Sequence, residues 1–402
     1  MPLLEREAQL AALASYAGEA RKAQGRLVLV AGEAGVGKSA LVEQLQRNLP
    51  AASWYWGACD GLFTPRPLGP LFDIAAKLGG ELLELCRADA PREALFGALL
   101  RQVSEPDELH VLVVEDIHWA DEATIDLLRF LGRRIREATV LLIVTYRDDA
   151  LAAGDPLQLA LGDLATQRSV RRISLGPLSA GAVQVMSGSS GRDAAALRQL
   201  TGGNPFYLSQ VIAAGADGKG EIPASARDAV LARTARLGAS ARTVLDAAAL
   251  IGTRVEFPLL ESVIECSPSA VDELLASGLL TGDGAAPKFR HEIARLAVQE
   301  AVPAHRRGPI HARILDALSR SGGDDDARMA FHAEGAADGP AVLRYAPAAA
   351  RRASGLGAHR EAAAQYERAL RFADGADAAE GGRPSEEPWR ADLLLHTPAE
   401  TS

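Results

Sequence analysis

The feature that most constrains the fold of this chain is a glycine-rich segment directly after a short apolar run. Residues 27–39 read Leu-Val-Leu-Val-Ala-Gly-Glu-Ala-Gly-Val-Gly-Lys-Ser and match the phosphate-binding pattern GxxxxGK(S/T). Glycines at these positions let backbone N–H groups point inward, and the helix that follows adds the partial positive charge of its N-terminus. We therefore predict a P-loop that binds ATP or ADP. The alternative is a glycine-rich turn with an exposed lysine.

Each part of this loop has an expected role. Lys38 is expected to reach the outer phosphates as a point charge and to act in catalysis, and the Ser39 hydroxyl is expected to coordinate Mg²⁺. The residues predicted to bind the nucleotide are Gly32, Glu33, Ala34, Gly35, Val36, Gly37, Lys38, Ser39 and Ala40.

Length and composition set limits on the protein class. A chain of 402 residues exceeds one ordinary hydrophobic core, so two to four domains are expected. The net charge of −9 argues against a protein that coats nucleic acid over its whole surface. Three cysteines without CxxC spacing favour reduced thiols. With no signal-peptide pattern and no membrane-length apolar run, we expect a cytoplasmic protein without membrane contact.

Four further apolar runs follow the P-loop strand, each separated by enough residues for a helix. They are 54–58, 111–115, 139–146 and 171–175. Continuous apolar strands that alternate with helices predict a five-stranded parallel sheet covered on both faces, an α/β P-loop NTPase fold. Ligands of such sheets bind at the carboxyl ends of the strands, so the residues directly after each strand are candidate site residues.

Two carboxylates end the strand 111–115. Glu115 and Asp116 follow four apolar residues, which is the Walker B pattern. One such acid supports Mg²⁺, and the next orients or deprotonates the water that attacks the γ-phosphate. We assign Glu115 to magnesium and Asp116 to the catalytic water; the alternative is two solvated carboxylates. Asp121 has the position of an N-cap before a helix at 122–136.

The strand 139–146 is followed by Arg147. An arginine here lies on the same sheet edge as the phosphates, so it is predicted to sense or stabilise the γ-phosphate as a catalytic residue. The alternative is a local ion pair with Asp148 or Asp149.

Four ordered motifs carry a resemblance to a known family. They are the loop 32–39, Glu-Asp-Ile-His-Trp-Ala-Asp at 115–121, Thr-Tyr-Arg-Asp at 145–148 and Gly-Gly-Asn-Pro-Phe at 202–206. Together they resemble the ATPase core of large LuxR-type transcriptional regulators. These belong to the STAND class of signalling ATPases, cousins of AAA+ proteins. The match covers roughly residues 1–320, and Glu115 departs from the more common Asp while keeping the charge.

The resemblance implies roles for three further residues. Arg6 corresponds to a segment beside the adenine, where the family usually has glycine in the position of Glu5. Pro205 belongs to a lid motif whose proline packs against the nucleotide; from the residues alone, it starts a helix after a turn. His291 resembles a histidine that contacts the phosphates in the resting state, although a lone histidine is more often structural.

The order of these patterns predicts five segments. They are a P-loop ATPase domain at 1–176, a helical lid at 177–236, a winged-helix domain at 237–307, a helical tetratricopeptide-like segment at 308–373 and a disordered tail at 374–402. Only half of one repeat unit is visible, at 357–370, where a stable solenoid needs about three units. Relatives in the family continue into longer repeats and a DNA-binding helix-turn-helix, which we expect to be missing here.

The charge of the predicted winged helix argues against DNA binding. Residues 222–320 contain twelve Arg and Lys against eleven Asp and Glu, and a balance of plus one is too small for a strong phosphate footprint. We interpret this domain as an internal clamp on the nucleotide, and we do not expect direct DNA binding.

These expectations combine into a nucleotide-driven switch with an unidentified inducer or protein partner. ADP would keep the module closed, ATP with Mg²⁺ would open it and permit self-association, and slow hydrolysis would reset it. Two other classes remain open at this stage. One is an AAA+ DNA-associated ATPase with a DNA-binding winged helix, and the other is a scaffold that binds nucleotide without hydrolysing it. A P-loop kinase is disfavoured, because no arginine-rich phosphate lid is evident.

Overall fold

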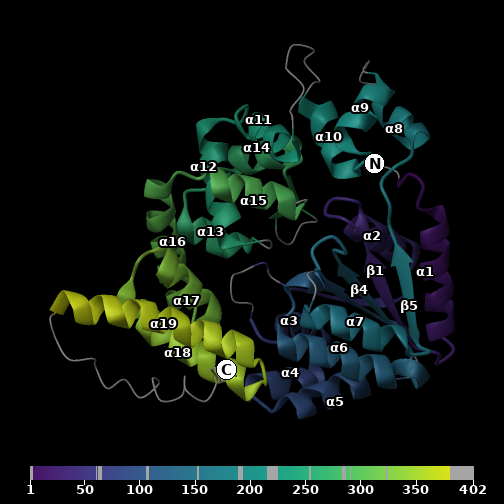
Figure 1. Ribbon diagram of the computed structural model, residues 1–402, viewed down its shortest axis with the longest axis horizontal. Coiled ribbons are helices and arrows are strands. Elements are labelled where there is room, and N and C mark those ends of the chain that lie inside the picture. The colour runs from purple at the N-terminus through teal and green to yellow at the C-terminus, as the bar shows by residue number, and fades with distance from the viewer. Residues whose placement is uncertain are drawn as a thin grey trace.

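A computed structural model describes most of the chain (Figure 1). The described residues are 3–59, 61, 66–105, 108–151, 154–188, 193–214, 225–252, 255–282, 287–289, 291–322 and 325–380, with backbone alone for 214 and 374–380. Within this part, no helix combines the length and apolar character needed to cross a bilayer.

A five-stranded parallel sheet forms the centre of the N-terminal half, in the order β2-β3-β4-β1-β5. The strands are β1 (Arg26–Ala31), β2 (Ser53–Ala58), β3 (His110–Glu115), β4 (Val140–Tyr146) and β5 (Val170–Ser174). This confirms the predicted P-loop NTPase sheet, and each strand end agrees with the prediction within one residue. Ala31 pairs with Tyr146 and Ala58 with Glu115, so the carboxyl ends of these strands meet at one edge.

Helices cover both faces of this sheet because alternate strand residues point to opposite sides. In β1, Leu27 and Leu29 enter one apolar cluster, and Val28 and Val30 enter the other. The cluster around Val28 includes residues of α1 (Glu7–Ala20) and α2 (Lys38–Asn48). The opposite face is covered by α3 (Gly69–Leu78), α4 (Gly80–Arg87), α5 (Arg92–Gln102), α6 (Glu122–Arg134) and α7 (Pro156–Ala165).

Two groups of helices follow the sheet, as predicted (Figure 1). The first group contains α8 (Ala180–Ser187), α9 (Ala194–Thr201) and α10 (Pro205–Ala214). The second contains α11 (Ala226–Thr234), α12 (Ala239–Ile251), α13 (Phe257–Val263), α14 (Pro268–Ser277), the antiparallel strands β6 (Leu280–Thr281) and β7 (Lys288–Phe289), and α15 (Glu292–Ala301). These elements occur in the order expected of the clamp domain, and their winged-helix classification stays a prediction.

The C-terminal region is largely helical. It contains α16 (Ala304–Arg320), α17 (Asp326–Gly335), α18 (Gly339–Gly355) and α19 (His359–Glu380). The prediction that disorder begins at residue 374 is wrong, because α19 continues to Glu380. Alanines at 373, 376, 378 and 379 favour the helix strongly enough to carry it past Gly375. Residues 381–402 of the predicted tail lie outside the described part.

The helices α18 and α19 fold back onto the ATPase domain. Ala353, Leu356, Ala358 and Ala362 belong to the same apolar cluster as one face of the sheet. Glu122, the first residue of α6, accepts hydrogen bonds from the first two N–H groups of α19, at 3.1 and 3.4 Å. A carboxylate at a helix N-terminus satisfies donors that have no partner within the helix. The C-terminal helices are therefore docked against the domain that carries the P-loop.

Candidate nucleotide-binding site

The loop between β1 and α2 has the tight curvature that phosphate binding requires. Gly32, Gly35 and Gly37 all have positive φ angles, of 152°, 78° and 103°. A Cβ atom on Gly35 would lie 2.7 Å from the Cβ of Phe206, and one on Gly32 would lie 2.7 Å from the carbonyl oxygen of Leu175. Side chains at these two positions are therefore excluded by contact as well as by backbone conformation.

Protein donors hold the carbonyl oxygens of this loop. Hydrogen bonds run from Lys38 Nζ to Gly32 O (2.7 Å) and Glu33 O (3.0 Å), from Asn204 Nδ2 to Ala34 O (2.8 Å), from Phe206 N to Gly35 O (3.2 Å) and from Arg6 NH2 to Val36 O (3.4 Å). A loop fixed through its carbonyl groups keeps its curl, and the N–H groups of such a curl form an anion-binding nest. The fit to a polyphosphate thus rests on loop geometry and on the start of α2 at Lys38.

The Lys38 ammonium lies inside the site, with only 7% of the residue exposed. Burial lowers its pKa, and the nearby carboxylates of Asp116, Asp149 and Asp148 act in the opposite direction. A cation with so little water around it is stabilised by oxyanions within reach, which is what the outer phosphates of a nucleotide supply.

Ser39 and Glu115 meet directly. The Ser39 hydroxyl donates to Glu115 Oε1 at 2.5 Å, which joins the start of α2 to the end of β3. A hydroxyl beside a carboxylate is an all-oxygen donor set of the kind that Mg²⁺ prefers. The two residues predicted to hold the metal therefore lie together and fit a magnesium ion chemically.

Asp116 follows Glu115 with an unusual backbone and a perturbed carboxyl group. Its φ is 57°, in the left-handed region, and its N–H donates to Thr145 Oγ1 at 3.0 Å. Burial, followed by the charge of Glu115, raises the pKa of Asp116 to about 7, with a smaller contribution of the same sign from Glu292 on α15. Lys38 acts against this shift.

Thr145 was not recognised in the sequence, although one signal was present. It is the hydroxyl-bearing residue before the end of the otherwise apolar strand β4, and only 1% of it is exposed. A buried hydroxyl in such a strand needs a partner, and here it accepts from the backbone of Asp116.

Arg147 lies at the edge of the site but is engaged locally. Its guanidinium forms an ion pair with Asp149 at 2.9 Å, as the alternative interpretation proposed. The same pair raises the pKa of Arg147, with Asp116 and Glu33 contributing. The residue is within electrostatic reach of the P-loop, and its γ-phosphate role stays a prediction.

Arg6 joins the P-loop to the segment after β5. Its guanidinium donates to Gly176 O at 2.6 Å and to Val36 O at 3.4 Å, and the residue is buried. Glu5, in the position where the family has glycine, adopts a φ of 56°, the conformation that glycine would supply. Its carboxylate accepts from the backbone N–H of Ser179 at 2.8 Å and from the Ser179 hydroxyl. This departure from the family pattern is therefore accommodated, and the adenine contact of Arg6 stays a prediction.

Pro205 opens α10, as the turn-and-helix interpretation predicted. Asn204 caps this helix, because its Oδ1 accepts from the N–H groups of Phe206 and Tyr207 at 3.1 and 3.3 Å. The same side chain donates to the P-loop through its Nδ2. The lid motif thus contacts the loop directly, and packing of Pro205 against a nucleotide stays a prediction.

His291 reaches the P-loop through an intermediate ring. Its imidazole lies 4.2 Å from the Phe206 ring, centroid to centroid, and Phe206 packs on Gly35. Nearby, Lys288 on β7 pairs with Glu43 on α2 at 3.1 Å. The predicted clamp domain therefore contacts both the lid and the helix that follows the P-loop.

Asp121 is confirmed as the N-cap of α6. Its Oδ1 accepts from the N–H of Thr124 at 2.9 Å, and its Oδ2 accepts from the N–H of Leu68 at 3.2 Å. Only 1% of the residue is exposed. This residue therefore has a structural role, close to the Walker B segment but separate from it.

A central parallel sheet, a phosphate loop between β1 and α2, and paired acids after the neighbouring β3 define the P-loop NTPase fold. The comparison with protein families agrees: residues 2–144 match the model described as AAA ATPase domain.

Two further comparisons extend over most of the chain. An uncharacterized protein of Rhizobium meliloti is 27% identical over 417 aligned residues, which cover 83% of this chain and 39% of that protein. The crystal structure of a Signal Transduction ATPase with Numerous Domains (STAND) protein with a tetratricopeptide repeat sensor, from Pyrococcus horikoshii, is similar with a TM-score of 0.60 at 16% identity. It covers 98% of this chain and 61% of that structure. Cdc6p from Pyrobaculum aerophilum is similar with a TM-score of 0.41 at 15% identity, over 80% of this chain and 95% of its own. The chain thus spans less than two thirds of the first two proteins.

Proposed function

We propose that this chain is the switch module of a LuxR-type STAND regulator, which binds ATP, hydrolyses it slowly and alternates between an ADP-closed and an ATP-open state. The observation that carries the proposal is the contact between Ser39 and Glu115. It joins the P-loop to the Walker B acid across 76 positions of the chain, beside Lys38 and Asp116.

The residues of the site divide the work of binding and hydrolysis. Lys38 and the N-terminus of α2 bind phosphate oxygens. Ser39 and Glu115 hold Mg²⁺, which supplies charge neutralisation between the outer phosphates. The ionised carboxylate of Asp116 orients the attacking water and accepts its proton, and Thr145 positions Asp116 through its backbone. Arg147 reaches the γ-phosphate after it leaves Asp149.

Contacts between the clamp domain and the ATPase domain support the closed state. The Lys288–Glu43 ion pair and the His291–Phe206 ring contact join the two domains at the P-loop. Both contacts involve elements next to the nucleotide site. A bound nucleotide that moves the loop or the lid therefore acts on the clamp.

The energy needed for switching is within the reach of the γ-phosphate. Changing a population from 1:99 to 99:1 takes about 5.5 kcal/mol of differential binding. Charge-assisted hydrogen bonds contribute roughly 1.5–3 kcal/mol each. Two to four such contacts, from Lys38, Arg147 and the residues around the metal, are sufficient.

The test is the size of the protein in solution with ADP, with ATP and with a non-hydrolysable ATP analogue, measured by light scattering. We expect the smallest species with ADP, larger species with the analogue, and a return to the small species as ATP is consumed. The same size in all three conditions contradicts the switch. Bound ADP that copurifies and never turns over favours the non-hydrolysing scaffold.

A DNA-associated ATPase is the less favoured alternative, because residues 222–320 have a balance of only plus one charge. Binding to a DNA duplex that weakens steeply with added salt would support that function instead.

A further inference from the structure

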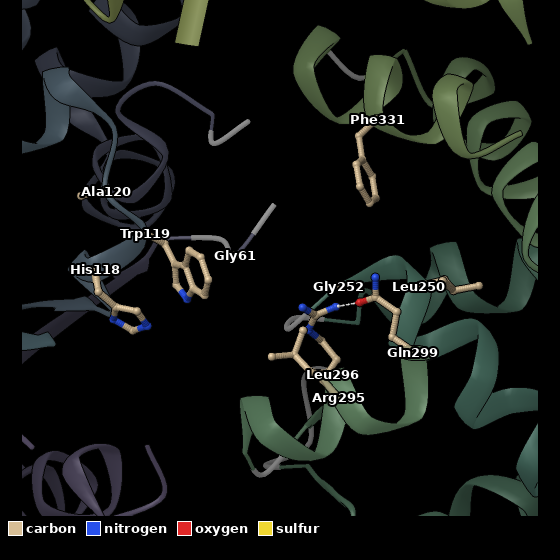
Figure 2. A pocket seen from close by; sticks show the side chains of 10 residues that line it. All are labelled: Gly61, His118, Trp119, Ala120, Leu250, Gly252, Arg295, Leu296, Gln299 and Phe331. Atoms are coloured by element: carbon tan, nitrogen blue, oxygen red, sulfur yellow. Dashed lines mark hydrogen bonds between the residues drawn. The ribbon is translucent and has the colours of Figure 1, made fainter. Parts of the chain in front are cut away.

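A cavity of about 490 Å³ lies where three parts of the molecule meet (Figure 2). Its described lining residues are Gly61, His118, Trp119, Ala120, Leu250, Gly252, Arg295, Leu296, Gln299 and Phe331. They come from the segments after β2 and β3, from the end of α12, and from α15 and α17. These lining residues include none of the P-loop, so the cavity is distinct from the phosphate site.

The walls of the cavity suit flat rings. Trp119 from the ATPase domain and Phe331 from α17 lie on opposite sides of the space in Figure 2, and Leu296 adds an apolar side chain from α15. A Cβ atom on Gly61 would lie 3.2 Å from the Trp119 ring, so glycine there leaves room for the indole. Two aromatic surfaces across a small space bind planar apolar groups by stacking and by burial of their area.

The charged group in the cavity is neutralised by the protein itself. The Arg295 guanidinium donates to both carboxylate oxygens of Glu292 at 2.9 Å and to Gln299 Oε1 at 2.5 Å. It also donates to the carbonyl oxygen of Ala249 at 3.1 Å. Because these contacts match the positive charge, the cavity favours an uncharged ligand over an anion.

His118 supplies a polar atom without a hydrogen-bond partner in the described part of the chain. Its Nδ1 is buried, its side chain is 5% exposed, and the nearest Asp116 oxygen is 3.9 Å away, beyond hydrogen-bond distance. Burial lowers the pKa of His118 to about 4, so the ring is neutral at neutral pH. A buried neutral imidazole nitrogen is costly unless something bonds to it, and an N–H or O–H group in the cavity does so.

We propose that this cavity is a regulatory site for an uncharged aromatic effector that carries one hydrogen-bonding N–H or O–H group. The volume lies within the range of about 300–1,000 Å³ that is typical of small-molecule sites. The ligand would contact Trp119, Phe331 and His118 together, and so it would join the ATPase domain to the C-terminal helices.

The position of the site explains how such a ligand acts on hydrolysis. His118 and Trp119 belong to a single 3₁₀ turn, Ile117–Trp119, which begins directly after Asp116. A ligand that orders this turn therefore acts on the residue assigned to the catalytic water. This coupling rests on the proposed ATPase function, whereas binding to the cavity does not.

The test uses N-phenyl-1-naphthylamine, an uncharged two-ring amine whose fluorescence rises in apolar sites. Leu296→Trp places a larger side chain into the cavity, and Leu159→Trp adds the same indole to an exposed position on α7. We expect saturable binding to the wild type, a loss of affinity of about tenfold or more in Leu296→Trp, and no change in Leu159→Trp. Phe331→Ala, which removes the opposite wall without adding bulk, is expected to weaken binding as well.

The outcomes separate this inference from the proposed function. Wild-type affinity in both cavity variants, each shown to be folded by circular dichroism, overturns the site. Displacement of the probe by ADP without a limiting value also overturns it, because that places the probe in the nucleotide site. A probe that binds and changes the rate of ATP turnover supports the coupling, and a probe that binds without changing a measurable rate overturns it. If no ATP turnover is found in any condition, the proposed hydrolysis fails while the binding result stands.

Discussion

Asp116 combines a strained backbone with a carboxyl group that titrates near neutral pH. A left-handed φ in a residue other than glycine costs on the order of 1 kcal/mol, and the hydrogen bond from its N–H to Thr145 holds that conformation. Strain and a raised pKa at one residue are common at functional sites. We therefore expect single substitutions here to affect turnover much more than nucleotide binding.

The first prediction concerns Asp116 itself. Because burial and Glu115 raise its pKa to about 7, the carboxyl group is protonated at pH 6 and cannot accept a proton from water. ATP turnover should therefore rise with pH through about 7 and level off above it. Asp116→Asn should leave ATP affinity intact and stop turnover. Normal hydrolysis by this variant would remove Asp116 from the catalytic role.

The second prediction concerns Glu292, whose negative charge helps to raise the pKa of Asp116 from the clamp domain. In Glu292→Gln the midpoint of the pH–rate profile should move to lower pH. Glu300→Gln, on the same helix but exposed and paired with Arg227, is the control and should leave the midpoint unchanged. Equal profiles for the two variants would show that α15 does not influence Asp116 electrostatically.

The third prediction concerns Lys38, which contacts loop carbonyls at 2.7 and 3.0 Å. Lys38→Ala removes both the loop contact and the charge for the outer phosphates, so nucleotide retention should be lost. Calorimetric titration with ATP measures this directly. Unchanged affinity would contradict the P-loop assignment.

At the scale of elements, the lid helix α10 is held to the P-loop by Asn204, which both caps the helix and donates to Ala34 O. Asp193 caps the neighbouring helix α9 in a similar way, accepting from the N–H groups of Ala195 and Ala196. The two residues form a matched pair, because only the cap of α10 also contacts the loop among these described hydrogen bonds.

The fourth prediction uses this pair. Asn204→Ala and Asp193→Ala should each destabilise the protein by about 1 kcal/mol, the usual contribution of an N-cap. Only Asn204→Ala should speed the release of ADP, by several-fold, because it also frees the P-loop carbonyl. Stopped-flow measurement with a fluorescent ADP analogue separates the two effects. Equal release rates in both variants would mean that the lid does not hold the loop.

At the scale of the whole molecule, the C-terminal helices are docked on the ATPase domain through a buried carboxyl group. Glu361 on α19 is 9% exposed, and its Oε2 has no hydrogen-bond partner in the described part of the chain. Burial, followed by the charges of Asp121 and Glu122 on α6, raises its pKa to about 7. At higher pH this interface contains several carboxylates that repel one another, with Arg360 paired to Glu122 at its edge.

The fifth prediction concerns the pH dependence of this interface. Since the pKa of Glu361 rises from 4.5 to about 7 on folding, the native state binds more protons than the unfolded chain between these values. Its contribution to stability is therefore present at pH 4.5 and is lost as the pH rises through 7. Glu361→Gln should stabilise the protein at pH 8, on the order of 2 kcal/mol, and change little at pH 5. Glu367→Gln, exposed on the same helix, is the control for thermal unfolding at both values.

Much of the site was predictable because its signals are local. The P-loop pattern, the strand that ends in Glu115 and the cap at Asp121 each depend on a few consecutive residues. Thr145 and Glu292 were not predictable in this way. Their importance depends on β4 lying beside β3 and on α15 lying near the Walker B segment, and nothing in the neighbouring residues indicates either.

The amino-acid sequence by itself determined the parallel sheet, the phosphate loop and the order of the helical parts, because backbone propensity and hydrophobic periodicity act over short stretches. The tertiary structure decided which groups meet across those stretches. It pairs Arg147 with Asp149, places His118 in the cavity and packs Ala353 to Ala362 on the ATPase core. These contacts depend on which apolar faces are buried together, and that choice is made by the whole chain at once.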